Sequence, residues 1–207
     1  FLPAQKKKSR NLIFVSGLHA LFPSELTKEM GARFFLEIEE SLRKEWKIER
    51  DAEKRGRSRE FTISEIERRA GDAKNYIQPQ ASRADVIFSL HMVNLDLLNA
   101  EERNNYLKLH VSLKSGIYYI DLTRVLIGIC GLHININKVH ETGGIDLEIQ
   151  GMVNGRDIAL ASRKLLPHLE ELVDAREEFN DGMLGVMQLI ALVEINESLT
   201  RRRRESI

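Results

Sequence analysis

Short apolar runs alternate with charged stretches along the first 90 residues. Three of these runs have the length and composition of strands buried on both faces of a parallel sheet, at residues 11–16, 32–38 and 84–90. The charged stretches predict helices at residues 25–31, from residue 39 into the fifties, and at residues 61–70. Strands that alternate with helices are typical of an α/β layer with a parallel sheet.

Capping and turn residues add detail to this part. Gly31 is expected to end the helix at residues 25–31, and Thr62 or Ser64 to cap the start of the helix at residues 61–70. Pro79 disfavours the helical region for the residue before it, so residues 76–80 are predicted to be extended.

The pattern changes after residue 90. Residues 91–105 become polar and are predicted as a linker between one part at residues 1–90 and another at residues 106–207. Residues 107–113 alternate apolar and polar with a period of two, as a half-buried antiparallel strand does. An α+β arrangement is predicted for the remainder: a helix at 117–132, strands at 133–138 and 143–153, a helix at 157–175 broken near Pro167, and a helix at 183–199 that is apolar almost all round.

Composition limits the setting of the protein. The 207 residues include 31 basic and 31 acidic side chains, so no overall field favours nucleic acid or an anionic membrane. Cys130 is the only cysteine, which excludes an internal disulfide and fits a reducing compartment. No apolar run reaches the roughly 18 to 20 residues of a membrane span and no signal peptide is found, so a cytoplasmic location without a nucleic-acid or membrane partner is expected.

Four cations surround a glycine in the middle of the first part. Lys47, Arg50, Arg55 and Arg57 flank Gly56. Arginine grips phosphate oxygens in pairs through its planar fork, and lysine acts as a point charge. Glycine weakens a helix, so a hinge is predicted there. A cationic arm on a hinge is typical of a lid that closes over a nucleotide and shields a transferring phosphoryl group.

Helical spacing orients these side chains. It places Lys47, Arg50 and Lys54 on one face and predicts that Asp51 and Glu53 turn elsewhere. An alternative stays open, because acidic neighbours could neutralise the cations by ordinary surface pairing and leave a solvated helix face. The acidic candidates are Glu49, Asp51, Glu53 and Glu60.

The same stretch resembles the lid and the following strand of the phosphoribulokinase and uridine kinase family. The strings R-D-x-x-x-R-G-R, Y-I-x-P-Q and A-D-V-I-F occur in the family's order and spacing. The resemblance implies that Arg50 and Arg55 bind ATP phosphates and that Lys47 and Arg57 face the phosphoryl acceptor. Uridine kinases usually carry arginine at the position of Lys47, which leaves the acceptor open. The matching residues are Arg50, Asp51, Arg55, Gly56, Arg57, Ile66, Arg69, Tyr76, Ile77, Pro79, Gln80, Ala84, Asp85, Val86 and Ile87.

The string S-G-L-H at residues 16–19 extends the resemblance toward the amino terminus. Family members carry Glu-Gly-Leu-His at this place, and their glutamate serves the magnesium and phosphate site. Ser16 replaces it here. His19 matches the family histidine, which implies a role in substrate binding, although a lone histidine at a strand end is also a common packing or capping residue.

The nucleotide-binding loop of this enzyme class does not occur in the 207 residues. Such an enzyme needs G-x-x-x-x-G-K-[ST], whose backbone amides and lysine hold the phosphates, and no such string is present. In the family this loop and the catalytic aspartate lie before the Glu-Gly-Leu-His strand. Two explanations stay open: the chain lacks the amino-terminal part of a kinase, or it is a degenerate relative that keeps the fold.

The carboxy-terminal region resembles, more loosely, that of phosphoribulokinases of the plant and cyanobacterial type. In the family this region adds strands to the sheet and contributes to subunit pairing, so a homodimer is implied. The resemblance is carried by Gly182, Gly185, Gln188, Leu189, Ile190 and Leu192.

These features predict a mostly parallel α/β sheet with flanking helices, of the P-loop kinase type, followed by an α+β part. The predicted function is ATP-dependent transfer of a phosphoryl group to a hydroxyl of a sugar phosphate or nucleoside, with ATP and Mg²⁺ implied by the resemblance. The alternative is a non-catalytic module that binds a nucleotide or anionic metabolite and mediates dimerisation. No catalytic residue and no metal ligand is assigned, since the spacing of His133 and His140 does not fit a metal site.

Overall fold

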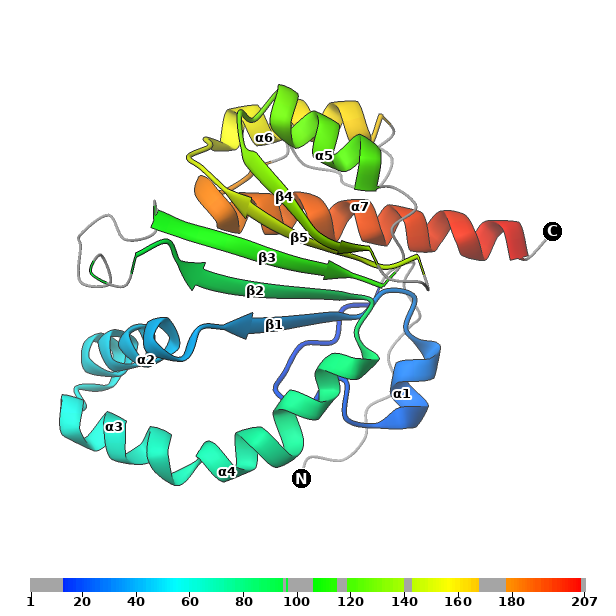
Figure 1. The fold of residues 1–207 in the computed structure, drawn as a ribbon. Coiled ribbons are helices and arrows are strands. Elements are labelled where there is room, and N and C mark those ends of the chain that lie inside the picture. Colours follow the sequence, from blue (N-terminus) through cyan, green and yellow to red (C-terminus); the bar gives the residue numbers. More distant parts are fainter. Residues whose placement is uncertain are drawn as a thin grey trace.

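The computed structural model describes residues 13–94, 96, 106–114, 119–139, 143–167 and 178–205, without the side chains of 138, 139 and 202–205. These residues form a five-stranded sheet in the order β1-β2-β3-β5-β4, with helices around it (Figure 1). The strands are β1 (Phe34–Ile38), β2 (Val86–Met92), β3 (Leu107–Leu113), β4 (His133–Val139) and β5 (Ile145–Gln150).

Parallel pairing is confined to one edge of this sheet. β1 runs parallel to β2, whereas β2, β3, β5 and β4 pair antiparallel with their neighbours. The predicted class of an α/β sheet with flanking helices is confirmed, but the sheet is mixed, because β3 to β5 join it through antiparallel pairs. β2 extends two residues into the predicted linker, to Met92, because it pairs with β3 from Val86↔Leu113 to Met92↔Leu107. The division into two domains stays a prediction, since most of the linker lies outside the described residues.

The described residues of the first predicted strand, 13–16 of 11–16, are not in a strand. Residues 13–16 pair with no strand in the described part of the chain, and their side chains are exposed. An apolar run becomes a stable strand only where a neighbouring strand supplies hydrogen bonds and a covered face. The apolar pattern at residues 13–16 is therefore not sufficient by itself to form a β-strand.

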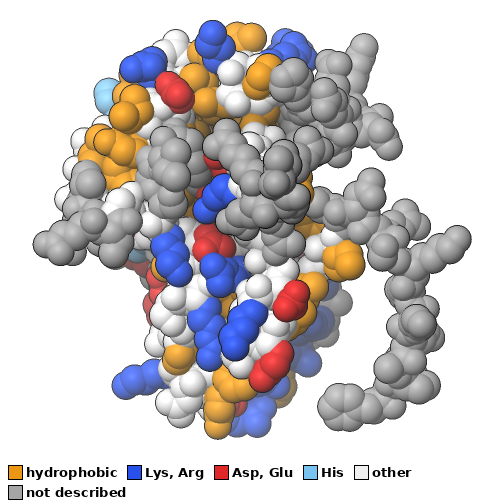
Figure 2. Space-filling model, turned by 90° about the vertical axis from the view of Figure 1, so that its right-hand side faces the viewer, with side chains coloured by type: hydrophobic (Ala, Val, Ile, Leu, Met, Phe, Trp, Pro, Cys, Tyr) orange, Lys and Arg blue, Asp and Glu red, His pale blue; other side chains and the backbone are white. Residues whose placement is uncertain are grey.

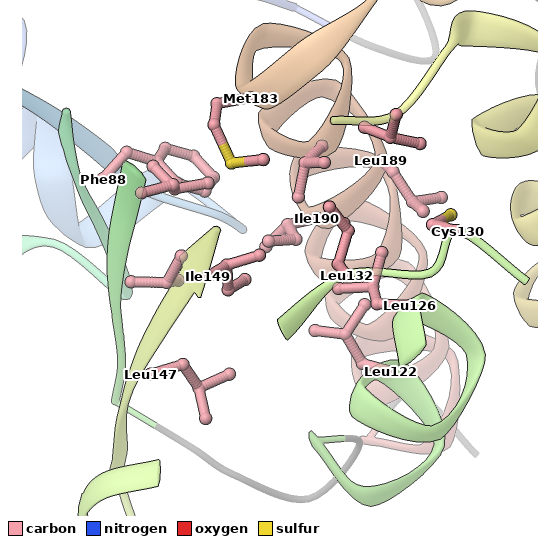
Figure 3. Packing of buried hydrophobic residues seen from close by; sticks show 14 of the residues in the cluster. Phe88, Leu122, Leu126, Cys130, Leu132, Leu147, Ile149, Met183, Leu189 and Ile190 are labelled. Carbon is pink, nitrogen blue, oxygen red and sulfur yellow. The ribbon is translucent and has the colours of Figure 1, made fainter. Parts of the chain in front are cut away.

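One face of the sheet carries the core. Buried and half-buried residues alternate along β2, β3 and β5, as the period of two predicts. Helices α5 (Tyr119–Gly128), α6 (Gly155–Leu165) and α7 (Gly182–Glu205) supply the opposing side chains. Figure 3 shows Leu122, Leu126 and Ile190 from these helices facing Leu147, Ile149 and Phe88 of the sheet. The core thus lies between the sheet and the carboxy-terminal helices.

Helix α7 packs part of its surface into the core, with 44% of its apolar window buried. By length and composition, Gly182–Arg201 would also suffice to cross a membrane, with a mean hydropathy of 1.3. This helix therefore corrects the expectation that no segment reaches that length. Its side chains Met183, Val186, Leu189 and Ile190 are at most 1% exposed in the core, which is what a central helix of a globular fold shows.

The start of α7 explains its glycines. A Cβ atom on Gly185 would collide with the carbonyl oxygen of Asn180, so the preceding segment can approach the helix only at glycine. Gln188 Oε1 accepts a hydrogen bond from the Asn180 N–H at 2.9 Å, which satisfies this polar side chain. In α6, Gly155 N–H donates to Asp181 Oδ1 at 2.6 Å. Gly185 and Gln188, two of the residues that carry the carboxy-terminal resemblance, therefore have structural roles.

The helices of the first part begin and end partly at unexpected residues. They are α1 (Ser24–Glu29), α2 (Glu40–Arg55), α3 (Arg59–Arg68) and the short α4 (Ala70–Asp72). Helix α1 ends at Met30 in an extended conformation, one residue before Gly31. Ser58 caps α3, and its hydroxyl accepts a hydrogen bond from Phe61 N–H at 3.2 Å, so the caps predicted at Thr62 and Ser64 are wrong.

The segment around Pro79 is helical, which corrects the predicted extended conformation. A π-helical turn, η1 (Ala73–Ile77), leads into a 3₁₀ helix, η2 (Gln78–Arg83). Pro79 lies in the first turn of η2, where its missing N–H has no partner to lose. Proline only disfavours the helical region for the residue before it, here Gln78, so the helical turn can still form.

Candidate functional site

The predicted lid is a helical hairpin formed by α2 and α3, here called the lid hairpin. It leaves the sheet at the carboxyl end of β1 (Figure 1). Glu39 fixes this exit, because its N–H donates to Leu90 O at 2.8 Å and its carboxylate accepts from Met92 N–H at 3.0 Å. Leu42 is fully buried, and Trp46 packs against the core. The hairpin is thus anchored where ligands bind in open α/β sheets, beyond the carboxyl ends of parallel strands.

Helix α2 ends at Gly56, where the sequence predicts a hinge. Gly56 ends α2 in the left-handed conformation, with φ 61° and ψ 28°, and its N–H donates to Ala52 O at 3.0 Å. Only glycine adopts this conformation without strain. An ion pair of 2.6 Å between Arg59 of α3 and Glu45 of α2 ties the two helices together beyond the turn.

A buried carboxylate gathers the arginines of the hairpin. Asp51 is 1% exposed, and its Oδ1 lies 3.0 Å from Arg50 Nη2 and 3.2 Å from Arg55 Nη1. Its Oδ2 lies 3.7 Å from Arg57 Nη1 and has no hydrogen-bond partner. We call Arg50, Arg55 and Arg57 around Asp51 the arginine cluster. Three positive charges against one negative charge leave a net charge of +2.

The position of Asp51 corrects the prediction that it turns away from the cations. Asp51 is four residues after Lys47 and four before Arg55, so helical spacing places all three on one side of α2. Burial alone raises the pKa of Asp51, but the hydrogen bond from Arg50 and the charges of Arg55 and Arg57 outweigh it, so the pKa lies below its usual range. The carboxylate is therefore ionised at neutral pH.

The remaining lid residues complete the cationic surface. Burial lowers the pKa of Lys47, and nearby arginines lower it further against the attraction of Asp51. The guanidinium group of Arg57 lies 5.2 Å from the centre of the Phe61 ring, a cation–π distance that holds it against α3. The surface-pairing alternative describes other residues better: Arg68 and Arg43 pair with Glu65 and Glu40 one turn away.

His19 lies apart from the arginine cluster. It is exposed in the turn after residues 13–16, with its ring 6.0 Å from that of Phe22. Gln80 holds this turn, since its amide accepts from Leu21 N–H at 3.0 Å and donates to Leu18 O at 2.9 Å. The structure thus groups the four lid cations and leaves His19 on another segment.

At the other end of the parallel pair the described residues carry charges of both signs. Arg33 and Asp85 precede β1 and β2 and form a two-pronged ion pair, with 2.6 Å between Arg33 Nη2 and Asp85 Oδ1. Figure 2, which faces this end of the sheet, shows Lys and Arg side chains standing among Asp and Glu. Asp85 of the A-D-V-I-F string therefore joins two strands.

A second ionisable group, the sheet-face cluster, was missed from the sequence. It comprises Glu39, His91, Lys108, His110 and Glu148 on the face of the sheet opposite the core. The rings of His91 and His110 lie 4.5 Å apart between their centres. Glu39 Oε2 lies 3.9 Å from His91 Nδ1, and Glu148 Oε2 lies 2.8 Å from His110 Nε2. Only the pairing of β2, β3 and β5 assembles these residues, so sequence spacing gave no signal.

Comparisons with known proteins agree with this architecture. Residues 2–95 match the model of the Phosphoribulokinase / Uridine kinase family. The chloroplastic phosphoribulokinase of Spinacia oleracea is 25% identical over 119 residues, which cover 58% of this chain and 29% of that protein. The phosphoribulokinase of Synechocystis sp. is 26% identical over 119 residues, covering 58% of this chain and 35% of that protein. The matches thus span about a third of these relatives' lengths.

The fold extends the likeness beyond the matched sequence. The solved structure of phosphoribulokinase from Rhodobacter spheroides superimposes with a TM-score of 0.50 and 19% identity, covering 71% of this chain and 50% of that one. At this identity the likeness establishes the fold.

Kinases of this family generally use ATP and Mg²⁺. The exposed donors of the arginine cluster fit the phosphates of a nucleotide. Among the described residues no group of three acidic, histidine or cysteine side chains could hold a metal ion, and Ser16, at the place of the family glutamate, is uncharged. Mg²⁺ would therefore depend on the nucleotide phosphates and water for most of its ligands. The amino-terminal part of this chain, residues 2–95, is thus similar to the phosphoribulokinase / uridine kinase family.

Proposed function

We propose that this chain is the lid-bearing part of an ATP-dependent kinase that transfers a phosphoryl group to a hydroxyl of a sugar phosphate or nucleoside. The arginine cluster carries the proposal. Its three guanidinium groups are 41–51% exposed, stand on a hairpin rooted at the carboxyl ends of two parallel strands, and share a single counter-charge. An array of half-exposed guanidinium groups with a net positive charge is a good binding site for a polyanion, because several charge-assisted hydrogen bonds can form at once.

The roles of the cations follow from their places on the hairpin. Arg50 and Arg55 bind the phosphates of ATP, which supplies the transferred group, and offset negative charge during transfer. Lys47, one turn earlier on α2, and Arg57, beyond the bend, orient the acceptor. His19 contributes to the acceptor side only if the turn that carries it approaches the hairpin.

The nucleotide-binding loop has to come from residues outside these 207. Two observations support a further part of the fold beside β1. The side chains of Ile13 and Phe14 are 74% and 76% exposed, and Leu36 of β1 is 53% exposed. Apolar side chains at an unpaired strand edge are typical of a surface that another element covers. A cytoplasmic homodimer is the setting we propose for the complete enzyme.

The alternative function is a non-catalytic module that binds a nucleotide or an anionic metabolite and mediates dimerisation. Ser16 favours it, because the family glutamate that serves the metal and phosphate site is replaced by an uncharged side chain. Both functions need phosphate binding at the arginine cluster, and only the first includes transfer.

Calorimetric titration of the 207-residue chain with ATP tests the shared requirement. Replacing both Arg50 and Arg55 with alanine removes two charge-assisted phosphate contacts, each worth about 1.5–3 kcal/mol, so we expect affinity to fall at least about tenfold. The matched control is the double variant Arg43→Ala and Arg68→Ala, which removes two exposed arginines paired one turn away on the same helices. It should change the affinity less than about twofold.

Equal affinities in the two double variants would remove the phosphate-binding assignment. Transfer is tested separately, on the complete gene product that contains this chain, with labelled ATP and Mg²⁺ and either ribulose 5-phosphate or uridine as acceptor. ATP binding without label on either acceptor would favour the non-catalytic alternative.

A further inference from the structure

Asp51 is unusual among the acidic residues of the lid hairpin. Glu40 and Glu65 lie on the surface and pair with arginines three or four residues away. Asp51 is 1% exposed and contacts three arginines, two on its own helix and one beyond the bend. Burying a carboxylate is costly unless cations and hydrogen bonds compensate for the lost water. Asp51, the buried charge of the hairpin, therefore has its three arginine neighbours as compensating cations.

Both the backbone and the side chain of Asp51 hold the bend. Its carbonyl oxygen accepts a hydrogen bond from Arg57 N–H at 3.1 Å, just after Gly56. Its Oδ1 accepts from Arg50 Nε at 3.1 Å and from Arg50 Nη2 at 3.0 Å. Its Oδ2 lies 3.7 Å from Arg57 Nη1 without a hydrogen bond. This buried oxygen can therefore accept a hydrogen bond from Arg57 if the guanidinium group moves closer.

The arginines repel one another when Asp51 is absent. Without Asp51 we expect the three arginine side chains to move apart toward water. Separation increases their side-chain entropy and reduces the repulsion between their like charges. Arg50 turns two nitrogens and Arg55 one nitrogen toward the same oxygen of Asp51, and both side chains stay half-exposed, so their remaining N–H donors are open to a ligand. A polyanion that meets the cluster then finds its donors already gathered, which lowers the ordering cost of binding.

We infer that Asp51 is a positioning residue, which holds Arg50, Arg55 and Arg57 in one array so that they bind the phosphate groups of a nucleotide together. This inference rests on the proposed function, since it assigns the ligand class of the same cluster. It has a distinctive consequence. By Coulomb's law alone, removal of a negative charge tightens anion binding. If Asp51 positions the arginines, its removal weakens anion binding instead.

The test compares Asp51→Asn with a control of equal charge change. Glu65→Gln also removes one carboxylate from arginines of the hairpin, Arg68 and Arg69, but these side chains are 66% and 65% exposed and lie outside the cluster. Glu65 also attracts Arg57 of the cluster, but more weakly than it attracts Arg68 and Arg69. Inorganic tripolyphosphate and ATP are titrated calorimetrically into each chain. We expect Asp51→Asn to weaken both at least about fivefold and Glu65→Gln to leave them unchanged or slightly tighter, because loss of preorganisation exceeds the gained attraction only where a carboxylate gathers the cations.

Two further variants separate positioning from general loss of structure. Asp51→Glu keeps the charge and should recover part of the affinity. Adding Asp51→Asn to the Arg50→Ala and Arg55→Ala background should cost little more, since the groups it positions are gone. Thermal unfolding by circular dichroism identifies a misfolded variant, and Asp51→Glu then carries the comparison. A ligand-free readout is the arginine Nε–H NMR signal, where a slowly exchanging Arg50 resonance should be lost in Asp51→Asn.

The outcomes separate this inference from the proposed function. If the wild-type chain binds neither anion, both fail. If it binds them and the double arginine variant loses binding, but Asp51→Asn binds equally or more tightly, only the positioning role is overturned. A full additional loss in the arginine-free background also overturns it, because Asp51 then acts through something other than these arginines.

Discussion

The lid hairpin and the carboxy-terminal layer of α5, α6 and α7 are held in place by different forces. The layer contributes most of its buried side chains to one apolar core with β2, β3 and β5. The hairpin contributes Leu42 and the partly buried Trp46 to that core, while Ile48 and Ile66 are buried outside it. Between its helices the specific links are ionic: Arg59 with Glu45, and Asp51 with Arg57.

This difference separates the scaffold from the part that responds to ligand. Apolar burial is not screened by salt as charge pairs are, and close packing holds it in one arrangement. Half-exposed ion pairs are weak and exchange readily with dissolved anions. Segments that close over ligands belong to the less stable parts of a fold. We therefore expect the hairpin to open locally while the layer stays intact, and the following predictions test that contrast.

The largest effect is expected in the core. Leu147→Ala should lower the free energy of unfolding by about 3 kcal/mol, because it removes a side chain that is 1% exposed between the sheet and the helices. Denaturant unfolding measures this loss. The matched change in the hairpin, Ile48→Ala, should lower the global value by about 1 kcal/mol or less and mainly speed amide exchange in α2. Equal global losses would show that hairpin and layer unfold as one unit.

A smaller effect is expected at the bend. Gly56→Ala forces a side chain into the left-handed conformation, which costs about 1 kcal/mol, and no neighbouring atom lies close enough to add a clash. The cost should appear as faster exchange of amides near the end of α2 and weaker tripolyphosphate binding. Gly71→Ala is the control: Gly71 is helical and also unobstructed, so alanine should be neutral or stabilising. A similar destabilisation by both substitutions would contradict the strained bend.

The smallest effect concerns pH and the sheet-face cluster. Burial lowers the pKa of His91 below its ordinary value of 6.5, and His110 and Lys108 lower it further against Glu39 and Glu37. The folded state thus favours neutral His91. Its contribution to stability is present above about pH 6.5 and is lost as the pH falls through the folded pKa.

Unfolding free energies measured between pH 7.5 and about pH 5 should therefore decline less in His91→Gln than in the wild-type chain. His133→Gln is the control, because His133 is exposed on β4 and lies outside the sheet-face cluster. If the unfolding free energy of His91→Gln falls with pH as steeply as that of the wild-type chain, His91 does not cause the pH dependence.

Local spacing determined much of this protein. The period of two predicted β3 and the apolar composition predicted α7 as a core helix, because both signals report which side chains leave water. The spacing of Lys47, Arg50, Arg55 and Arg57 around Gly56 likewise placed a cationic bend, since helix geometry and glycine conformation act within a few residues.

Tertiary structure decided what depends on partners distant in sequence. Residues 13–16 have a strand pattern but find no strand to pair with in the described part of the chain, and β3 to β5 turn a parallel pair into a mixed sheet. His91 and His110 meet only through strand register. Burial made Asp51 the centre of the arginine cluster, because a carboxylate withdrawn from water needs cations that a surface carboxylate does not.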